Sequence, residues 1–225
     1  MYTLKPVITG DGSSTFFIPE LNEHYHSTFG AVQESNHIFI NSGLIFFLQK
    51  NQEMREISIF EMGFGTGLNA FLTWMAIRNL NLKVKYTTIE KYPIDLSIIQ
   101  QLNLKNIFKD DYLLTVFEEM HTTDWENKRE FDNFILNKIQ TDITNYQPTD
   151  KFNLVYFDAF APDIQPELWS KNIFEKIYQS LYSGSILTTY SAKGTIRRLL
   201  SDIGFQVEKI QGPPGKRHIL RAFVK

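Results

Sequence analysis

The sequence predicts an α/β fold in which a mostly parallel sheet carries helices on both faces. Strand-like and helix-like segments alternate from residue 56 to residue 204, the pattern of strands joined by crossover helices. A glycine-rich stretch, 63–67, stands between the first of these strands and the first helix. The last two strand-like segments, 205–211 and 218–225, are joined by a loop too short for a crossover helix, so they are expected to pair antiparallel.

Two elements precede this alternation. Residues 2–8 and 15–18 flank the turn-rich "TGDGSS" and predict a hairpin with Asp-Gly at its centre. Residues 29–50 carry apolar side chains at helical spacing, interrupted near Asn41–Gly43, and predict one or two helices. Neither a repeat nor a linker is evident. We therefore expect one structural unit, with 1–50 as an N-terminal hairpin and helical extension and 51–225 as a Rossmann-like domain.

Each element of that domain follows from its residue pattern. Runs rich in β-branched and aromatic residues predict strands at 56–62, 83–90, 132–140, 152–160 and 184–190. Apolar residues at helical spacing predict helices at 68–80, 93–102, 170–182 and 193–204, the second opened by Pro93 and the last stopped by Gly204. Residues 103–130 form a polar and aromatic insertion, expected to be helical and assigned no role. A parallel sheet ending in an antiparallel hairpin indicates the seven-stranded Rossmann-like architecture of class I S-adenosylmethionine methyltransferases.

Composition excludes several classes of site. The 225 residues are 43% hydrophobic, enough for one full-sized core. The absence of cysteine excludes disulfides, Cys-ligated zinc and thiol nucleophiles. The histidines are dispersed, and His24 and His26 lack a third ligand, so no metal is expected. Neither a signal peptide nor a membrane-spanning apolar run is present, so the sequence predicts a soluble, cytoplasmic protein.

The glycine-rich stretch is a candidate cofactor site. Gly63, Gly65 and Gly67 allow a tight turn and let a ligand approach the backbone closely. A dinucleotide fingerprint needs glycine at position 68, where Leu68 stands, so NAD is disfavoured. S-adenosyl-L-methionine is favoured, because its amino-acid moiety can lie against such a turn.

Carboxylates end the two following strands. Glu90 can accept hydrogen bonds from two ribose hydroxyls, although a solvated strand-end acid is the alternative. Asp142 can accept from an adenine amino group while Ile143 packs on the ring; the alternative is a helix cap or turn residue. These positions and the glycine turn fall at the carboxyl ends of adjacent strands, where open α/β sheets bind ligands.

Asp158 ends the next strand and is the candidate catalytic residue. Its strand is expected beside the glycine-turn strand, so the carboxylate should face the reactive end of the cofactor. A carboxylate there can orient an amine and accept its proton. Phe160 and Pro162 can form an apolar wall that stacks a flat base. The alternative is a turn stabilised by the Asp158 side chain and shaped by proline.

Basic residues gather at the end of the chain. Although the formal net charge is −2, the segment from Lys193 to Lys225 carries eight basic residues against two acids. Such a distribution is typical of a surface that meets phosphate, and a solvated helix face with a basic end accounts for it equally well.

Five segments together resemble the methyltransferase domain of the tRNA wobble-uridine enzyme MnmC and its stand-alone (DUF752, MnmD-like) relatives. They extend from about residue 10 to the C-terminus in the family's order: "YHSTFGAVQES", "FEMGFGTGLNAFLTW", "YFDAFAPDIQPELW", "TYSAKGTIRRLLSDIGF" and "GPPGKRHILRAF". The resemblance implies S-adenosylmethionine-dependent N-methylation of 5-aminomethyl-(2-thio)uridine in tRNA, giving 5-methylaminomethyl-(2-thio)uridine. It implies Asp158 as the acid/base-type residue, and it places around the cofactor Gly63, Gly65, Gly67, Glu90 and Asp142.

The bifunctional members also carry an FAD-dependent oxidase domain, which this sequence lacks, so we expect methylation alone. The basic residues would then hold the phosphates of the tRNA anticodon stem-loop while the wobble base turns out toward Asp158; they are Lys193, Arg197, Arg198, Lys216 and Arg217.

Two other functions stay open at this point. One is a small-molecule amine methyl- or aminopropyltransferase, against which the basic C-terminal region argues because a cationic substrate favours an acidic pocket. The other is a non-catalytic RNA-binding protein with a vestigial cofactor fold, against which the intact glycines, Glu90 and Asp158 argue.

Overall fold

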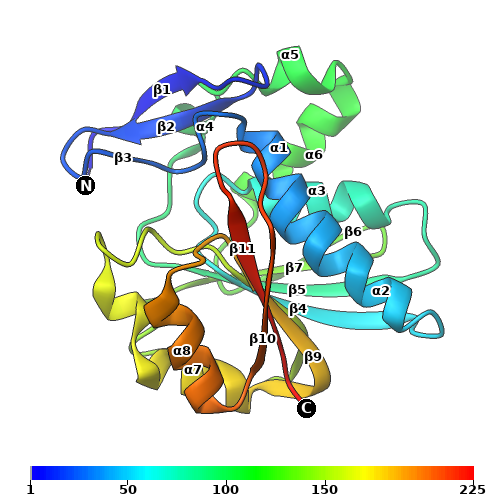
Figure 1. The fold of residues 1–225 in the computed structure, drawn as a ribbon. Coiled ribbons are helices and arrows are strands. Elements are labelled where there is room, and N and C mark those ends of the chain that lie inside the picture. Colours follow the sequence, from blue (N-terminus) through cyan, green and yellow to red (C-terminus); the bar gives the residue numbers. More distant parts are fainter. Residues whose placement is uncertain (1) are drawn as a thin grey trace.

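The computed structural model describes residues 2–225, and in them an eight-stranded sheet lies between two layers of helices (Figure 1). The strand order is β10-β11-β9-β8-β4-β5-β7-β6. The five central strands are parallel, and β11 runs antiparallel to both β9 and β10. This confirms the predicted mostly parallel sheet with its C-terminal hairpin. The strands are β4 (Glu56–Met62), β5 (Lys83–Glu90), β6 (Lys128–Phe131), β7 (Phe134–Gln140), β8 (Phe152–Phe157), β9 (Leu181–Thr189), β10 (Gln206–Gln211) and β11 (His218–Phe223).

Strand β6 is the difference from the seven strands expected. The prediction that 103–130 is helical is confirmed for α5 (Leu104–Phe108) and α6 (Asp111–Thr122) and is wrong for β6. This strand pairs antiparallel with β7 at the sheet edge. The connecting turn places Asp132 at φ 52°, a conformation that aspartate tolerates better than most residues. Because β6 is short and mostly exposed, it carries no apolar alternation that would predict a strand.

The N-terminal region adds a second sheet and a long helical segment. Strands β1 (Lys5–Ile8) and β2 (Ser14–Ile18) form the predicted hairpin, which β3 (Glu23–His24) extends. Helix α1 (Ala31–Ser35), the π-helical η1 (Asn36–Ile45) and α2 (Phe46–Lys50) then follow without a break. Of the one or two helices predicted over 29–50, the structure forms one continuous helical segment, and the interrupted apolar pattern near Asn41–Gly43 does not break it. A Cβ on Gly43 would lie 3.2 Å from Tyr156 Cε1, so this glycine allows the helix to approach the sheet closely.

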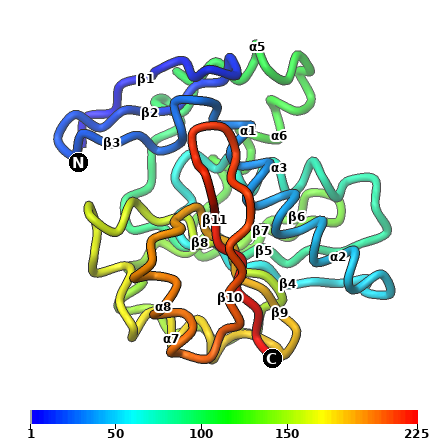
Figure 2. Tube along the Cα trace, in the orientation of Figure 1, coloured from blue at the N-terminus to red at the C-terminus, as the bar shows by residue number. Residues whose placement is uncertain are grey.

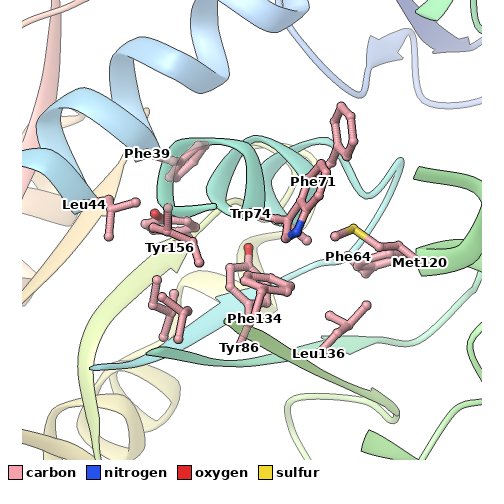
Figure 3. Close-up of a cluster of buried hydrophobic side chains, with 14 of the residues drawn as sticks. Phe39, Leu44, Phe64, Phe71, Trp74, Tyr86, Met120, Phe134, Leu136 and Tyr156 are labelled. Atoms are coloured by element: carbon pink, nitrogen blue, oxygen red, sulfur yellow. The ribbon is translucent and has the colours of Figure 1, made fainter. Parts of the chain in front are cut away.

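The remaining helices cover the two faces of the sheet. They are α3 (Leu68–Ile77), α4 (Leu96–Ile99), the 3₁₀-helix η2 (Pro166–Trp169), α7 (Lys171–Gln179) and α8 (Gly194–Ile203). Helix α4 begins three residues beyond Pro93, and α8 ends before Gly204 as predicted. Side chains alternate along β8. Leu154 and Tyr156 join the core under η1 and α3, where Figure 3 shows Tyr156. Val155 and Phe157 join the core under α7 and α8.

The carboxyl ends of β4, β5, β7 and β8 lie side by side in the sheet. The loop between β10 and β11 reaches past this edge to the N-terminal region (Figures 1 and 2). There, a Cβ on Gly215 would lie 2.3 Å from the Phe29 ring. Segments from both parts of the chain thus meet above the ends of the central strands. Over residues 2–225, every helix is too short or too polar to cross a membrane.

Candidate active site

A cavity of about 630 Å³ opens at the carboxyl ends of the central strands. It brings together most of the residues that the sequence suggested for cofactor and substrate: Gly63, Gly65, Glu90, Asp142, Ile143, Asp158, Phe160 and Lys216. The other suggested residues do not line it: Gly67, Pro162, Lys193, Arg197, Arg198 and Arg217. The N-terminal segment 23–29 and Glu34, for which the sequence predicts no role in the site, form part of its wall.

The glycine turn needs glycine at each of its three positions. Gly63, Gly65 and Gly67 have φ angles of 89°, 51° and 70°, in the left-handed region that side chains disfavour. The Gly63 N–H donates to the Ile89 carbonyl at 3.1 Å, which ties the turn to β5. A Cβ on Gly65 would lie 3.3 Å from the Tyr25 ring, and one on Gly67 would lie 2.8 Å from His121 Cε1. The turn is therefore packed on both sides and leaves backbone facing the cavity.

Glu90 is fixed by the backbone around it. Its Oε2 accepts from the Gly65 N–H at 3.1 Å, and its Oε1 accepts from the Tyr92 N–H at 2.9 Å. Each carboxylate oxygen retains a further lone pair, so the group can still accept from ligand hydroxyls.

The sequence offers Asp142 either as an acceptor for adenine or as a cap or turn residue. In the structure its side chain stabilises a turn, and the residue also lines the cavity. Its Oδ1 accepts from the Thr144 N–H at 2.9 Å, and its Oδ2 lies 2.8 Å from Lys91 Nζ. The hydrogen bond from Lys91 is the main reason that the pKa of Asp142 falls to about 2. This side chain is therefore a carboxylate acceptor at any physiological pH.

Asp158 lies directly after β8, next to the strand that carries the glycine turn. Its Oδ2 accepts from Asn69 Nδ2 at 2.8 Å, and Asn69 belongs to the first turn of α3. Desolvation raises the pKa of Asp158 to about 7; the Asn69 hydrogen bond opposes the rise, and the charge of Glu34 adds to it. A carboxyl group that titrates near neutrality can take up and release a proton under physiological conditions.

Two further polar residues, Glu61 and Asn69, flank the glycines in the sequence. Glu61 is 0% exposed, and burial raises its pKa to about 8, so its carboxyl group is protonated at neutral pH. Asn69 Oδ1 is buried and has no hydrogen-bond partner among the described residues, although Asn69 lines the cavity. Neither residue is among those that the sequence predicts for the site. Glu61 could have been noticed as an acid near the end of a largely apolar strand, and Asn69 as an amide in the first turn of the helix that follows the glycines.

The N-terminal segment supplies aromatic rings to the cavity wall. Tyr25 packs edge-on against Phe160 with ring centroids 5.1 Å apart. His26 lies 3.2 Å from Thr15 Oγ1 and 3.4 Å from Thr66 Oγ1, and desolvation lowers its pKa to about 4. His26 is therefore a neutral, hydrogen-bonding residue.

The five suggested phosphate contacts fall into two groups. Lys216 Nζ lies 2.7 Å from Glu34 Oε1 and 5.2 Å from the centre of the Tyr190 ring, inside the cavity. Lys193 pairs with Asp163 at the surface. Arg197, Arg198 and Arg217 are exposed and make no ion pair with any residue from 2 to 225. Within the same residues, no group of three acidic or histidine side chains is placed to hold a metal ion.

Comparison with known proteins identifies the family. The profile described as S-adenosyl-L-methionine-dependent methyltransferase, Methyltransf_30, matches residues 100–225, more than half of the chain. The chain belongs to this family. This methyltransferase is similar to the tRNA 5-methylaminomethyl-2-thiouridine biosynthesis bifunctional protein MnmC of Paraburkholderia xenovorans (26% identity, 96% of this chain, 34% of that protein). The MnmC protein of Pseudoalteromonas atlantica is 28% identical over 89% of this chain and 31% of its own length.

A solved structure extends the similarity to the whole methyltransferase. MNMC2 from Aquifex aeolicus superimposes with a TM-score of 0.78 at 25% identity, covering 100% of this chain and 72% of that one. The methyltransferase spans about a third of the length of the curated relatives that it matches.

The cavity fits the cofactor that the family uses, S-adenosyl-L-methionine. The glycines in the left-handed conformation expose their backbone to the cavity. The unpartnered Asn69 Oδ1 can accept a hydrogen bond from the ammonium group of the cofactor, and Glu90 can accept from its ribose hydroxyls.

Proposed function

We propose that this chain transfers a methyl group from S-adenosyl-L-methionine to the amine of 5-aminomethyl-(2-thio)uridine at the wobble position of tRNA, forming 5-methylaminomethyl-(2-thio)uridine. The observation that carries the proposal is the placement of Asp158, a carboxyl group with a pKa of about 7, in one cavity with the glycine turn. The names of the MnmC relatives support the choice of substrate.

We assign cofactor binding to one side of the cavity. The backbone of Gly63 and Gly65, with Asn69 Oδ1, would hold the amino-acid moiety; Gly67 would act by starting α3. Glu90 would hold the ribose, and Asp142 with Ile143 the adenine. When bound, the cofactor supplies an electrophilic methyl group.

Asp158 would prepare the substrate amine. An alkylamine is mostly an ammonium ion at neutral pH and has no free lone pair, because its pKa resembles that of lysine. The ionised Asp158 would accept one proton from the ammonium group, and the freed nitrogen lone pair would take the methyl group. Asn69 would hold Asp158 Oδ2 toward the amine. Phe160 and Tyr25 would pack against the turned-out base, while Pro162, outside the cavity lining, would shape the loop.

The exposed arginines Arg197, Arg198 and Arg217, together with Lys193, would contact phosphates of the anticodon stem-loop. Lys216 is held inside the cavity by Glu34, so we assign it to the base rather than to a phosphate.

The test uses the purified protein, S-adenosyl-L-methionine and tRNA that carries 5-aminomethyl-2-thiouridine. Nucleoside mass spectrometry should detect 5-methylaminomethyl-2-thiouridine with the wild type and none with Asp158→Ala, while both bind S-adenosylhomocysteine in a calorimeter. An unmethylated nucleoside after incubation with the wild type would refute the function, and normal methylation by Asp158→Ala would refute the role of that residue. Methylation of a free aliphatic amine in preference to tRNA would favour a small-molecule enzyme.

A further inference from the structure

The insertion between β5 and β7 has no part in the function described so far, yet its helix α6 reaches the glycine turn. His121, in the last turn of α6, lies with its ring against two residues of the turn. The ring centroids of His121 and Phe64 are 5.3 Å apart, and those of His121 and Phe117 are 4.5 Å apart. A Cβ on Gly67 would lie 2.8 Å from His121 Cε1. The imidazole therefore fills the space behind the turn.

His121 also meets the backbone of the turn. Its Nε2 lies 3.1 Å from the Thr66 carbonyl, and its Nδ1 lies 2.8 Å from the carbonyl of Phe117, one helical turn back. Thr66 is 3% exposed, and the backbone bond at the start of α3 runs from Phe71 to Gly67 instead. The Thr66 carbonyl thus needs a donor from elsewhere, and His121 supplies it in the tautomer that carries its proton on Nε2. A neutral ring has one N–H, so in that tautomer Nδ1 donates no hydrogen bond to the Phe117 carbonyl. Desolvation, which lowers the pKa of His121 to about 4, keeps the ring neutral.

Lys138 of β7 contacts both His121 and the aromatic rings beside it. The residue is 0% exposed, and its ammonium group donates to the His121 carbonyl at 2.9 Å, near the end of α6. The same Nζ lies 4.7 Å from the centre of the Trp125 ring and 5.3 Å from that of Phe64. Phe64, of the glycine turn, belongs to one buried cluster with Met120 of α6 (Figure 3). The turn, α6 and β7 are therefore joined through one group of side chains.

We propose that His121 is a positioning residue for S-adenosyl-L-methionine: it fixes the Thr66–Gly67 backbone of the glycine turn, and Lys138, Trp125 and Phe64 hold it in place. A turn that is ordered before the cofactor arrives loses less conformational freedom when the cofactor binds. The insertion then serves to preorganise the cofactor site. This inference rests on the assignment of the glycine turn to the cofactor.

The experiment compares three variants by calorimetric titration with S-adenosylhomocysteine and by thermal unfolding. His121→Leu keeps the bulk but removes the donor, so Kd should rise about tenfold. His121→Gln can place its amide nitrogen near the position of Nε2, so Kd should stay within about threefold of the wild type. Val116→Ala is the matched control, because Val116 is buried on the same helix and makes none of these contacts; Tm should fall while Kd stays unchanged.

A purely structural role would lower Tm in all three variants and leave Kd unchanged, and that result would overturn the inference. If His121→Leu does not fold, Trp125→Leu replaces it, because this partly buried ring packs on Phe64 with centroids 6.0 Å apart. Its Kd should rise about threefold, and an unchanged Kd would again overturn the inference. Failure of the wild type itself to bind S-adenosylhomocysteine would instead refute the cofactor assignment, which separates the two claims.

Discussion

Asp158 and Asn69 are joined by a hydrogen bond of 2.8 Å across 89 residues of sequence. The bond links the end of β8 to the first turn of α3, so the amide holds one oxygen of the carboxyl group that we assign to proton transfer. It also favours the ionised form of Asp158, against the desolvation that raises the pKa of this group to about 7.

The first prediction concerns the pH dependence of methylation. Below pH 7 the protonated Asp158 cannot accept a proton, so kcat/KM should fall about tenfold per pH unit on the acid side. Asn69→Leu removes a hydrogen bond that lowers the pKa of Asp158, so the acid limb should move to higher pH. Rates measured from about pH 5.5 to pH 9 give both profiles. An acid limb that does not move in Asn69→Leu would contradict the coupling.

The second prediction concerns stability and Glu61. Burial raises the pKa of Glu61 from 4.5 to about 8, so the folded state binds a proton that the unfolded state has released between these values. The stability that this proton contributes is complete below pH 4.5 and is lost as the pH rises through about 8. Glu61→Gln lacks the titration, so its free energy of unfolding should change less over this range, by on the order of 4 kcal/mol. Urea unfolding at the two ends of the range measures the difference; equal pH dependence in both proteins would show that Glu61 is not held neutral.

A third prediction separates phosphate contacts from base contacts. Arg217→Gln should weaken tRNA binding and reduce the slope of log Kd against log salt concentration by about 1, because one phosphate contact is lost. Lys216→Met should lower kcat and leave that slope unchanged, because Lys216 is paired with Glu34 inside the cavity. The double variant Glu34→Gln/Lys216→Met controls for an unpaired buried carboxylate. Equal changes of slope at 216 and 217 would assign both residues to phosphates.

The fourth prediction concerns Gly67. Gly67 has a φ of 70°, which disfavours any side chain. A Cβ added there would also lie 2.8 Å from the His121 ring and 2.9 Å from the Phe64 ring. Gly67→Ala should therefore cost about 2–4 kcal/mol of unfolding free energy. Gly184→Ala is the matched comparison, since Gly184 has a φ of 79° and no atom within 4 Å of an added Cβ. If both variants lose the same stability, the backbone conformation alone accounts for the cost.

Local patterns were sufficient to predict the elements whose residues are buried by the sheet itself. Strands β4, β5 and β8 are rich in β-branched and aromatic residues, and their order along the chain places the glycine turn, Glu90 and Asp158 at one edge. The pattern around Gly43 left one or two helices open, because a glycine in a helical pattern looks the same whether it breaks the helix or lets it approach the sheet.

The residues that complete the site were harder to predict because their roles depend on partners far away in sequence. Glu34 meets Lys216, Asn69 meets Asp158, and His121 meets Thr66. Only the tertiary fold brings these partners together, so no local sequence pattern indicates the pairs. The cavity position of Lys216 in particular distinguishes it from the exposed Arg217 beside it, which has the same charge.

The Glu34–Lys216 pair has a consequence for synthesis of the protein on the ribosome. The glycine turn and Glu90 leave the ribosome well before Lys216 is added, because more than a hundred residues separate them. A nascent chain therefore carries the turn without the Glu34–Lys216 ion pair of the cavity wall. Incomplete translation products should accordingly lack the Lys216 part of the cavity wall, which we assign to the substrate base.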